Sequence, residues 1–295
     1  MNMMNHSKNF KNLVWHKLLA VFSVISGLFS TSLAWAGEND YGVASEWQID
    51  TQAPATDLMA NMISFHNLML WIISLVVVFV SVLLLIVIFK YNAKANPVPA
   101  KFTHNTLIEI VWTVVPIMIL VIIAIPSFDL LYKQRVIPEP DFTIKVTGNQ
   151  WYWSYEYPDH GDIAFDSVMI PEDELQEGQL RLLAVDNEVI VPVNKTVRLI
   201  VTGADVIHAW TIPSFGVKID TIPGRLNEAW FKANREGIYY GQCSELCGKD
   251  HAFMPIAVRV VSDAEFAKWL EEAKVKFASV PAIQQIKVAS LSAAE

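Results

Sequence analysis

Two cysteines, a histidine and a methionine lie close together near the C-terminal end of the chain. Cys243, Cys247, His251 and Met254 follow one another at steps of four, four and three residues within the segment 241–254. Soft thiolate and thioether donors combined with imidazole favour copper, and methionine is a poor ligand for zinc. So many donors on one short loop indicate a metal site rather than core packing.

A second histidine, His208, comes directly after a strand-like run, where the end of a barrel could deliver it to the same place. With two thiolates available, each sulfur can bridge two copper ions, and each ion can take one histidine. Met254 and a backbone carbonyl would then supply the weak outer positions. One electron shared by two ions in fixed ligands suits electron transfer rather than bond chemistry.

Other interpretations of these residues remain open. Two cysteines with three residues between them in an exported protein can form a disulfide, although His208, His251 and Met254 argue against a simple one. Two cysteines and two histidines also complete a tetrahedral zinc site without a methionine. A blue-copper centre is less natural because it uses a single cysteine.

The N-terminal segment has the layout of a secretory signal peptide. Lysines at 8, 11 and 17 precede an apolar stretch that ends near Leu33, and Ala34-Trp35-Ala36 is a small-x-small cleavage site. We therefore predict a signal peptide over residues 1–36 and a mature chain that begins at Gly37. An uncleaved first membrane helix is the alternative.

Two further apolar runs, Leu68 to Phe89 and Leu107 to Ile125, are long enough to cross a hydrocarbon core of about 30 Å. The connection between them carries lysines and no acid, whereas residues 37–61 carry acids and no base. The positive-inside rule therefore places the connection in the cytoplasm and both flanks outside. This predicts an external segment over 37–61 and a transmembrane hairpin over 62–132.

Glu109 lies inside the second apolar run, about one turn from its cytoplasmic start. Ionisable residues at membrane depth are costly and usually face protein or a water path, which indicates a function. A carboxylate that snorkels to the interface is the alternative.

Beyond the hairpin, residues 133–278 change to short β-branched and aromatic runs separated by turns, which indicates a sandwich or Greek-key barrel. The predicted strands include 142–146, 189–193, 197–202 and 256–261. Ser262 and Glu265 form a capping-box pattern that predicts a closing helix to about Phe277. The tail over 279–295 has no assigned role.

Composition excludes several classes of function. The net charge of −8 argues against a nucleic-acid partner, and most of the excess acid falls after Lys133, where it would attract a basic partner. The sequence contains no Gly-rich phosphate loop, nucleophile elbow or repeat, so hydrolase and nucleotide-binding functions find little support.

The chain resembles subunit II of cytochrome c oxidase over nearly the whole predicted mature sequence. The motifs that carry this resemblance are the cysteine segment 241–254, the segment around His208, and the runs 150–157 and 222–227. The resemblance implies a membrane-anchored α+β chain, with the two-helix hairpin followed by a cupredoxin-like Greek-key β-barrel. It also implies a bacterial plasma-membrane location with the C-terminal domain in the periplasm or outside.

The resemblance further implies the metal ligands and cofactors. A dinuclear copper centre, CuA, is expected to be bound by His208, Cys243, Cys247, His251, Met254 and the main-chain carbonyl of Glu245. The Glu245 side chain is expected to reach a magnesium ion shared with subunit I.

Four more residues have roles implied by the resemblance. Trp151 matches the point where electrons enter from cytochrome c, and Asp205 and Glu156 match acidic residues of the docking face. Glu109 matches the carboxylate at the mouth of a proton path into subunit I. From the residues alone, the aromatic run 151–157 is better explained by core packing or an interface, and Asp205 by a solvated turn.

The expected partners are the haem-bearing subunit I, subunit III and a cytochrome c. The cytochrome c must be a separate protein, because the sequence contains no Cys-x-x-Cys-His motif for a fused haem. Two rival functions are a quinol oxidase counterpart, which lacks the copper ligands, and a copper-delivery protein, which the long hairpin and Glu109 disfavour.

Overall fold

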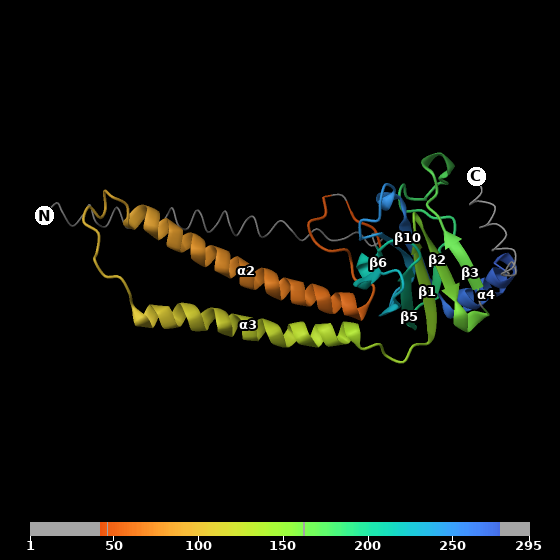
Figure 1. Cartoon of the computed structure of the whole chain (residues 1–295), viewed down its shortest axis with the longest axis horizontal. Coiled ribbons are helices and arrows are strands. Elements are labelled where there is room, and N and C mark those ends of the chain that lie inside the picture. The colour runs from red at the N-terminus through yellow and green to blue at the C-terminus, as the bar shows by residue number, and fades with distance from the viewer. Residues whose placement is uncertain (1–41, 46, 162, 278–295) are drawn as a thin grey trace. The chain divides into compact units, whose positions relative to one another are not determined.

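A computed structural model describes residues 42–45, 47–161 and 163–277 of the chain. The predicted signal peptide and the tail over 279–295 lie outside these residues. The described part consists of two long helices followed by a β domain and a closing helix (Figure 1).

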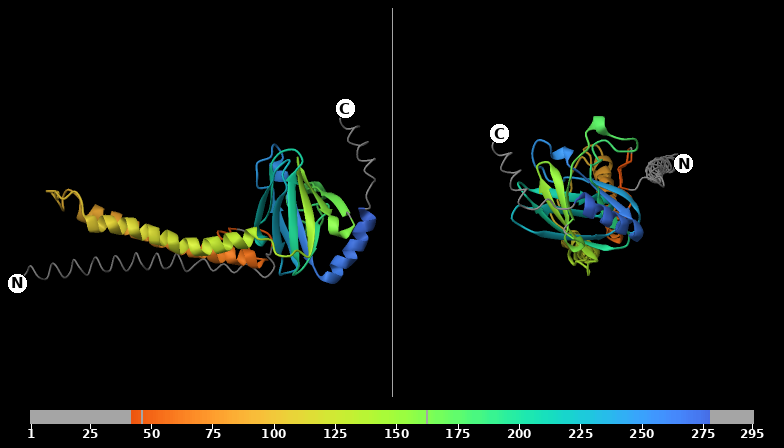
Figure 2. Two further views of the ribbon diagram at one scale, coloured as in Figure 1. Left: turned by 60° about the horizontal axis from the view of Figure 1, so that its bottom comes forward. Right: turned by 90° about the vertical axis from the view of Figure 1, so that its right-hand side faces the viewer.

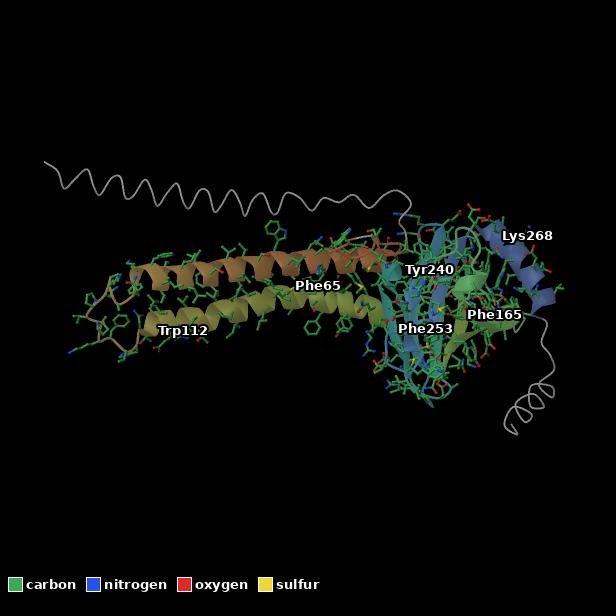
Figure 3. The ribbon with its side chains drawn as sticks, turned by 90° about the horizontal axis from the view of Figure 1, so that it is seen from above. Phe65, Trp112, Phe165, Tyr240, Phe253 and Lys268 are labelled. Atoms are coloured by element: carbon green, nitrogen blue, oxygen red, sulfur yellow. The ribbon has the colours of Figure 1, made fainter. Side chains whose placement is uncertain are left out.

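The two long helices are α2, Asp57–Lys90, and α3, Thr106–Arg135. Both are long and apolar enough to cross a membrane, with mean hydropathy of 3.5 and 2.7 in their most apolar windows. Figure 3 shows their side chains projecting outward along both ribbons, with Phe65 and Trp112 labelled. Apolar side chains that stay exposed over such a length are expected where lipid replaces water.

Helix α2 begins at Asp57, before the predicted start of the hairpin at residue 62. The Thr56 side chain caps the helix by accepting the Met59 amide, and its hydroxyl donates to the carbonyl of Phe215 at 2.8 Å. At the other helix, the Trp230 indole donates to the carbonyl of Lys133 at 3.2 Å. Both helices are therefore bonded to the β domain near these ends, through contacts that apolarity alone does not show.

The β domain contains three sheets, with strand orders β3-β2-β1-β5-β8, β4-β10-β9 and β6-β7. Pairs β1–β5 and β4–β10 are parallel and the remaining pairs are antiparallel. The strands are β1 Phe142–Asn149, β2 Tyr152–Tyr157, β3 Ile163–Ser167, β4 Val189–Pro192, β5 Thr196–Gly203, β6 His208–Ile212, β7 Val217–Thr221, β8 Asn227–Lys232, β9 Gly237–Gln242 and β10 Pro255–Val261. The prediction of a transmembrane hairpin followed by a β-barrel domain is confirmed.

Alternation along the strands builds the core, because successive side chains point to opposite faces of a sheet. Strand β1 alternates between buried and half-buried positions over its whole length. In β2, Trp153, Tyr155 and Tyr157 are fully buried, so the aromatic run predicted from sequence contributes largely to the core.

The closing helix is α4, Asp263–Lys276, and its predicted capping box is present between Ser262 and Glu265. Its Phe266 stacks on Phe142, and its Trp269 packs against Tyr157. Figure 2 shows α4 lying along the side of the β domain. The helix therefore covers one end of the aromatic core.

The acidic stretch over 159–187 has no function assigned from sequence, and it contributes the edge strand β3 to the largest sheet. Ile163, Phe165 and Ser167 alternate inward with Ala164 and Asp166 outward. A strand of five residues with two polar positions gives only a weak sequence signal, which accounts for its omission from the predicted strands.

Candidate metal centre

Residues from two separate parts of the chain meet at one end of the β domain. His208 is the first residue of β6, and Cys243 and Cys247 lie in the loop that follows β9. One ligand atom from each of these three residues lies within 4.8 Å of the other two. All three residues are buried, so the cluster is shielded from solvent.

The remaining predicted donors join this cluster. Nδ1 of His251 lies 3.5 Å from Sγ of Cys247, and Sδ of Met254 lies 3.6 Å from the same sulfur. The backbone carbonyl oxygen of Glu245 is 3.3 Å from Sγ of Cys243. The six donor groups predicted from sequence are therefore close neighbours in space.

Strand pairing and two glycines explain how these side chains fit together. The amide of Ser244 donates to the carbonyl of Ala209 at 3.1 Å, which fixes the cysteine loop to β6. A Cβ at Gly148 would lie 2.8 Å from the imidazole of His208, so only glycine leaves space for this ring. Gly248 has a φ of +128°, a backbone conformation that L side chains rarely adopt.

Asp205 sets the orientation of the buried histidine. The Nε2 atom of His208 donates to Oδ1 of Asp205 at 2.8 Å, and the ring's Nδ1 faces Sγ of Cys243 at 3.9 Å. An ionised carboxylate can only accept, so the neutral ring keeps its proton on Nε2 and presents the lone pair of Nδ1 to the cluster. A carboxylate behind a histidine is the usual support for a metal-binding imidazole.

The cluster also shifts the pKa values of its members. Burial alone would lower the pKa of His208, but Cys243 and Asp205 outweigh it and the pKa is raised. Burial raises the pKa of Cys243, yet its hydrogen-bonding contacts with His208 and with the neighbouring backbone bring it down to about 7. Burial and the nearby charge of Cys243 raise the pKa of Cys247 to about 12. One thiolate is therefore readily formed, and the second needs a cation to stabilise it.

These residues fit copper better than the alternatives. Both cysteines are free, and their sulfurs lie 3.9 Å apart, so a native disulfide is not formed. Met254 is 1% exposed, with its sulfur directed at Cys247, which a Cys2His2 zinc site would not require. The cluster of imidazole, thiolate and thioether groups is thus consistent with a copper site.

The other predicted functional residues lie in different places. Trp151 is half-buried beside the cluster, and a Cβ at Gly248 would lie 3.1 Å from its indole ring. Glu156 forms an ion pair with Lys145 at 2.7 Å, across the β1–β2 ladder. Glu109 is half-buried in the first turn of α3, in the membrane hairpin.

Two residues at the cluster are not predicted as functional from sequence. Trp153 donates its indole N–H to the carbonyl of Met254 at 3.1 Å, and its ring lies edge-on to His208. Gln150 donates its side-chain amide to the carbonyl of Cys247 at 2.7 Å. Their closeness to Trp151 in sequence is a hint, but spacing alone cannot reveal partners about a hundred positions away.

Comparisons with known families and proteins agree with this geometry. The family described as cytochrome C oxidase subunit II, periplasmic domain, matches residues 142–261, and the one described as its transmembrane domain matches residues 44–130. The match to the periplasmic domain covers strands β1 to β10, and the match to the transmembrane domain covers most of the helix hairpin.

Similar individual proteins come from several organisms. The chain is 56% identical to a "Probable cytochrome c oxidase subunit 2" of Rickettsia bellii over 76% of this chain and 83% of that protein. It is 49% identical to the cytochrome c oxidase subunit 2 of Cyanidium caldarium over 77% of this chain and 91% of that protein. A solved periplasmic domain of subunit II from Bradyrhizobium japonicum is 67% identical, covering 48% of this chain and 99% of that one, with a TM-score of 0.45.

Proposed function

The chain belongs to the cytochrome c oxidase subunit II family, and we propose that it takes electrons from a cytochrome c and passes them to haem in subunit I, where oxygen is reduced to water. It is a membrane protein with two transmembrane helices and a periplasmic domain. The observation that carries the proposal is the convergence of six donor groups at one buried end of that domain.

Cys243, Cys247, His208 and His251 would hold the proposed pair of copper ions, with Met254 and the Glu245 carbonyl as weaker donors. Both thiolates would be shared between the two ions. When bound, a pair of copper ions supplies a one-electron acceptor whose charge is shared between two metal ions. The surrounding strands and the Asp205–His208 hydrogen bond hold the donors in place. A fixed, fully ligated site favours electron transfer over substrate chemistry.

Trp151 is the proposed point where electrons enter. Its ring is half-buried at the edge of the core and packs against Gly248, the residue after Cys247. Lys249 lies over the same ring, with Nζ 6.0 Å from its centroid. An aromatic ring that is partly open to solvent on one side and close to a cysteine ligand on the other can connect a docked partner to the centre.

Docking of cytochrome c is proposed to use Asp205 and, more weakly, Glu156. Asp205 keeps 34% of its side chain exposed while it holds His208. Glu156 is already paired with Lys145, which reduces the net charge that it offers to a basic partner. The two acids also lie toward opposite ends of β2, so Asp205 is the better placed beside Trp151.

The remaining proposed partners are subunit I and subunit III. The side chain of Glu245 is exposed, whereas its carbonyl faces Cys243, so one residue can contact the copper site and a magnesium ion shared with subunit I. Glu109, half-buried in the hairpin, is proposed to stand at the mouth of a proton path into subunit I.

Purification of the chain with its partner subunits, followed by an assay of reduced cytochrome c oxidation, tests this function. Oxidation with oxygen uptake is expected, and copper should co-purify with the chain. An intact complex that holds copper but never oxidises cytochrome c would indicate copper delivery. Oxidation of quinol instead of cytochrome c would indicate the quinol oxidase counterpart.

A further inference from the structure

Gln150 bonds to both halves of the proposed metal site from a single position. It lies in the turn between β1 and β2, next to Trp151. Its backbone N–H donates to Oδ2 of Asp205 at 2.7 Å, and its side-chain amide donates to the carbonyl of Cys247 at 2.7 Å. The first bond reaches the turn that leads into His208 on β6, and the second reaches the loop that carries both cysteines.

The backbone bond acts on the histidine side of the site. Asp205 accepts from three donors, which are the Gln150 amide, the Val206 amide and Nε2 of His208. The Gln150 amide therefore fixes the carboxylate that in turn fixes the buried imidazole. Outer partners of this kind orient metal-binding side chains and tune the metal.

The side-chain bond acts on the cysteine side. The carbonyl of Cys247 belongs to the peptide that joins it to Gly248, and the ring of Trp151 packs against this same glycine. A Cβ at Gly248 would lie 3.2 Å from Nε2 of Gln150 and 3.1 Å from Cζ2 of Trp151. Two neighbouring residues of one turn therefore meet the same peptide, one by a hydrogen bond and the other by packing.

We propose that Gln150 is a positioning residue that clamps the Cys247–Gly248 peptide against Trp151, and so sets the electronic contact between the aromatic ring and the metal centre. This inference rests on the proposed function, because it assigns Gln150 a part in the same electron relay. Gln150 touches neither the metal nor a substrate, so its effect passes through Trp151 and Cys247.

The amide chemistry identifies the variants that test the clamp. Gln150→Glu keeps the length and shape of the side chain but, when ionised, offers only acceptors to the Cys247 carbonyl. Gln150→Leu removes the donor without adding charge. Gln242→Leu is the matched control, because Gln242 lies one residue before Cys243 and its side chain is exposed.

In the purified oxidase complex, both Gln150 variants should keep the copper content of the unaltered protein. Reduction of the centre by cytochrome c should slow by roughly 10- to 100-fold, the range found when an outer-shell partner is lost. Reduction by a small-molecule reductant should stay unchanged, and the near-infrared band should shift. Gln242→Leu should match the unaltered complex in each of these measurements.

A second measurement uses the metal-free full-length chain in detergent. Loss of the clamp should speed hydrogen exchange at the amides of Ser244 and Phe253, which hold the cysteine loop through bonds to Ala209 and Asp250. This comparison needs no bound copper. It therefore tests the clamp separately from the proposed function. If the unaltered protein bound no copper pair, the proposed function would be contradicted, but the clamp would still be tested.

Two results would overturn the inference. In the first, both Gln150 variants match the unaltered protein in the rate at which cytochrome c reduces the centre and in the rate of hydrogen exchange. The second is complete loss of copper from both variants, which would make Gln150 necessary for metal binding rather than for positioning Trp151.

Discussion

Oδ1 of Asp205 lies 2.8 Å from Nε2 of His208, so a partly exposed carboxylate and a fully buried imidazole form one hydrogen-bonded pair. The family resemblance implies only a docking role for Asp205. The structure adds a contact that points inward, because the same carboxylate supports a proposed metal ligand. Removal of this charge should therefore affect the metal centre as well as the encounter with cytochrome c.

Asp205→Asn tests this double role. The amide can still meet His208, but it no longer stabilises the ring with a full charge, so copper affinity should fall by about 10- to 100-fold. Competition with a copper chelator on the full-length chain measures the change. Unaltered copper affinity, with only a salt-dependent rise in KM for cytochrome c, would restrict Asp205 to docking.

Trp151→Gln separates electron transfer from metal binding. Trp151 packs on Gly248 and its indole N–H finds no hydrogen-bond partner among the described residues, so the ring is not needed to hold a ligand. Copper content should stay intact while cytochrome c oxidation slows by more than about tenfold, or about 1.4 kcal/mol in activation free energy. Trp47→Gln, at a tryptophan that is 95% exposed, serves as a control for the loss of an indole. Normal turnover in Trp151→Gln would place the electron path elsewhere.

Glu109→Gln tests the proton path. The residue is half-buried in the first turn of α3, far in sequence from the metal loop. Oxygen uptake by the complex should drop by more than about tenfold, or about 1.4 kcal/mol, while the copper spectrum is unchanged. Lys101→Gln, in the exposed connection between the helices, should have little effect. Equal turnover in both variants would favour a snorkelling carboxylate.

His160 gives the β domain a pH-dependent stability. Its ring packs between Phe142 and Phe266, and burial lowers its pKa. A histidine whose pKa is lower in the folded state binds its proton more tightly when the chain is unfolded. Protonation therefore favours the unfolded state, and the free energy of unfolding decreases as the pH falls through about 6.5.

Thermal unfolding of the full-length chain at pH 7.5 and pH 5 measures this effect. His160→Leu should lose part of the acid-induced drop in melting temperature. The nearby charges of Asp159 and Lys274 oppose each other, raising and lowering the pKa respectively, so neither alone dictates the result. An identical drop in the variant and the unaltered chain would assign the acid sensitivity to other groups.

Much of the fold follows from patterns that the sequence shows directly. The two apolar runs predict the hairpin, and the Ser262–Glu265 pair predicts the start of α4 correctly. The start of α2 at Asp57 does not follow from apolarity, because Thr56 caps the helix by accepting the Met59 amide and its hydroxyl donates to the carbonyl of Phe215, which is distant in sequence. Strand β3 was missed because its alternation is short and polar.

The proposed donor residues are predictable because their chemistry is unusual and because four donor side chains, together with the Glu245 carbonyl, lie in the segment 243–254. His208 required the further assumption that the end of a strand meets this loop, and the structure bears this out. The supporting contacts of Gln150 and Trp153 could not be predicted, because amide and indole groups bond to backbone carbonyls that carry no sequence signature.

The central claim is that both sulfurs bridge a pair of copper ions. Metal analysis and paramagnetic resonance on the full-length chain, with Cys247→Ser beside it, test this claim most directly. We expect two copper ions per chain and a signal from one electron shared by two equivalent nuclei, both lost in Cys247→Ser. A single copper or zinc ion in the unaltered chain, or an unchanged signal in Cys247→Ser, would contradict the claim.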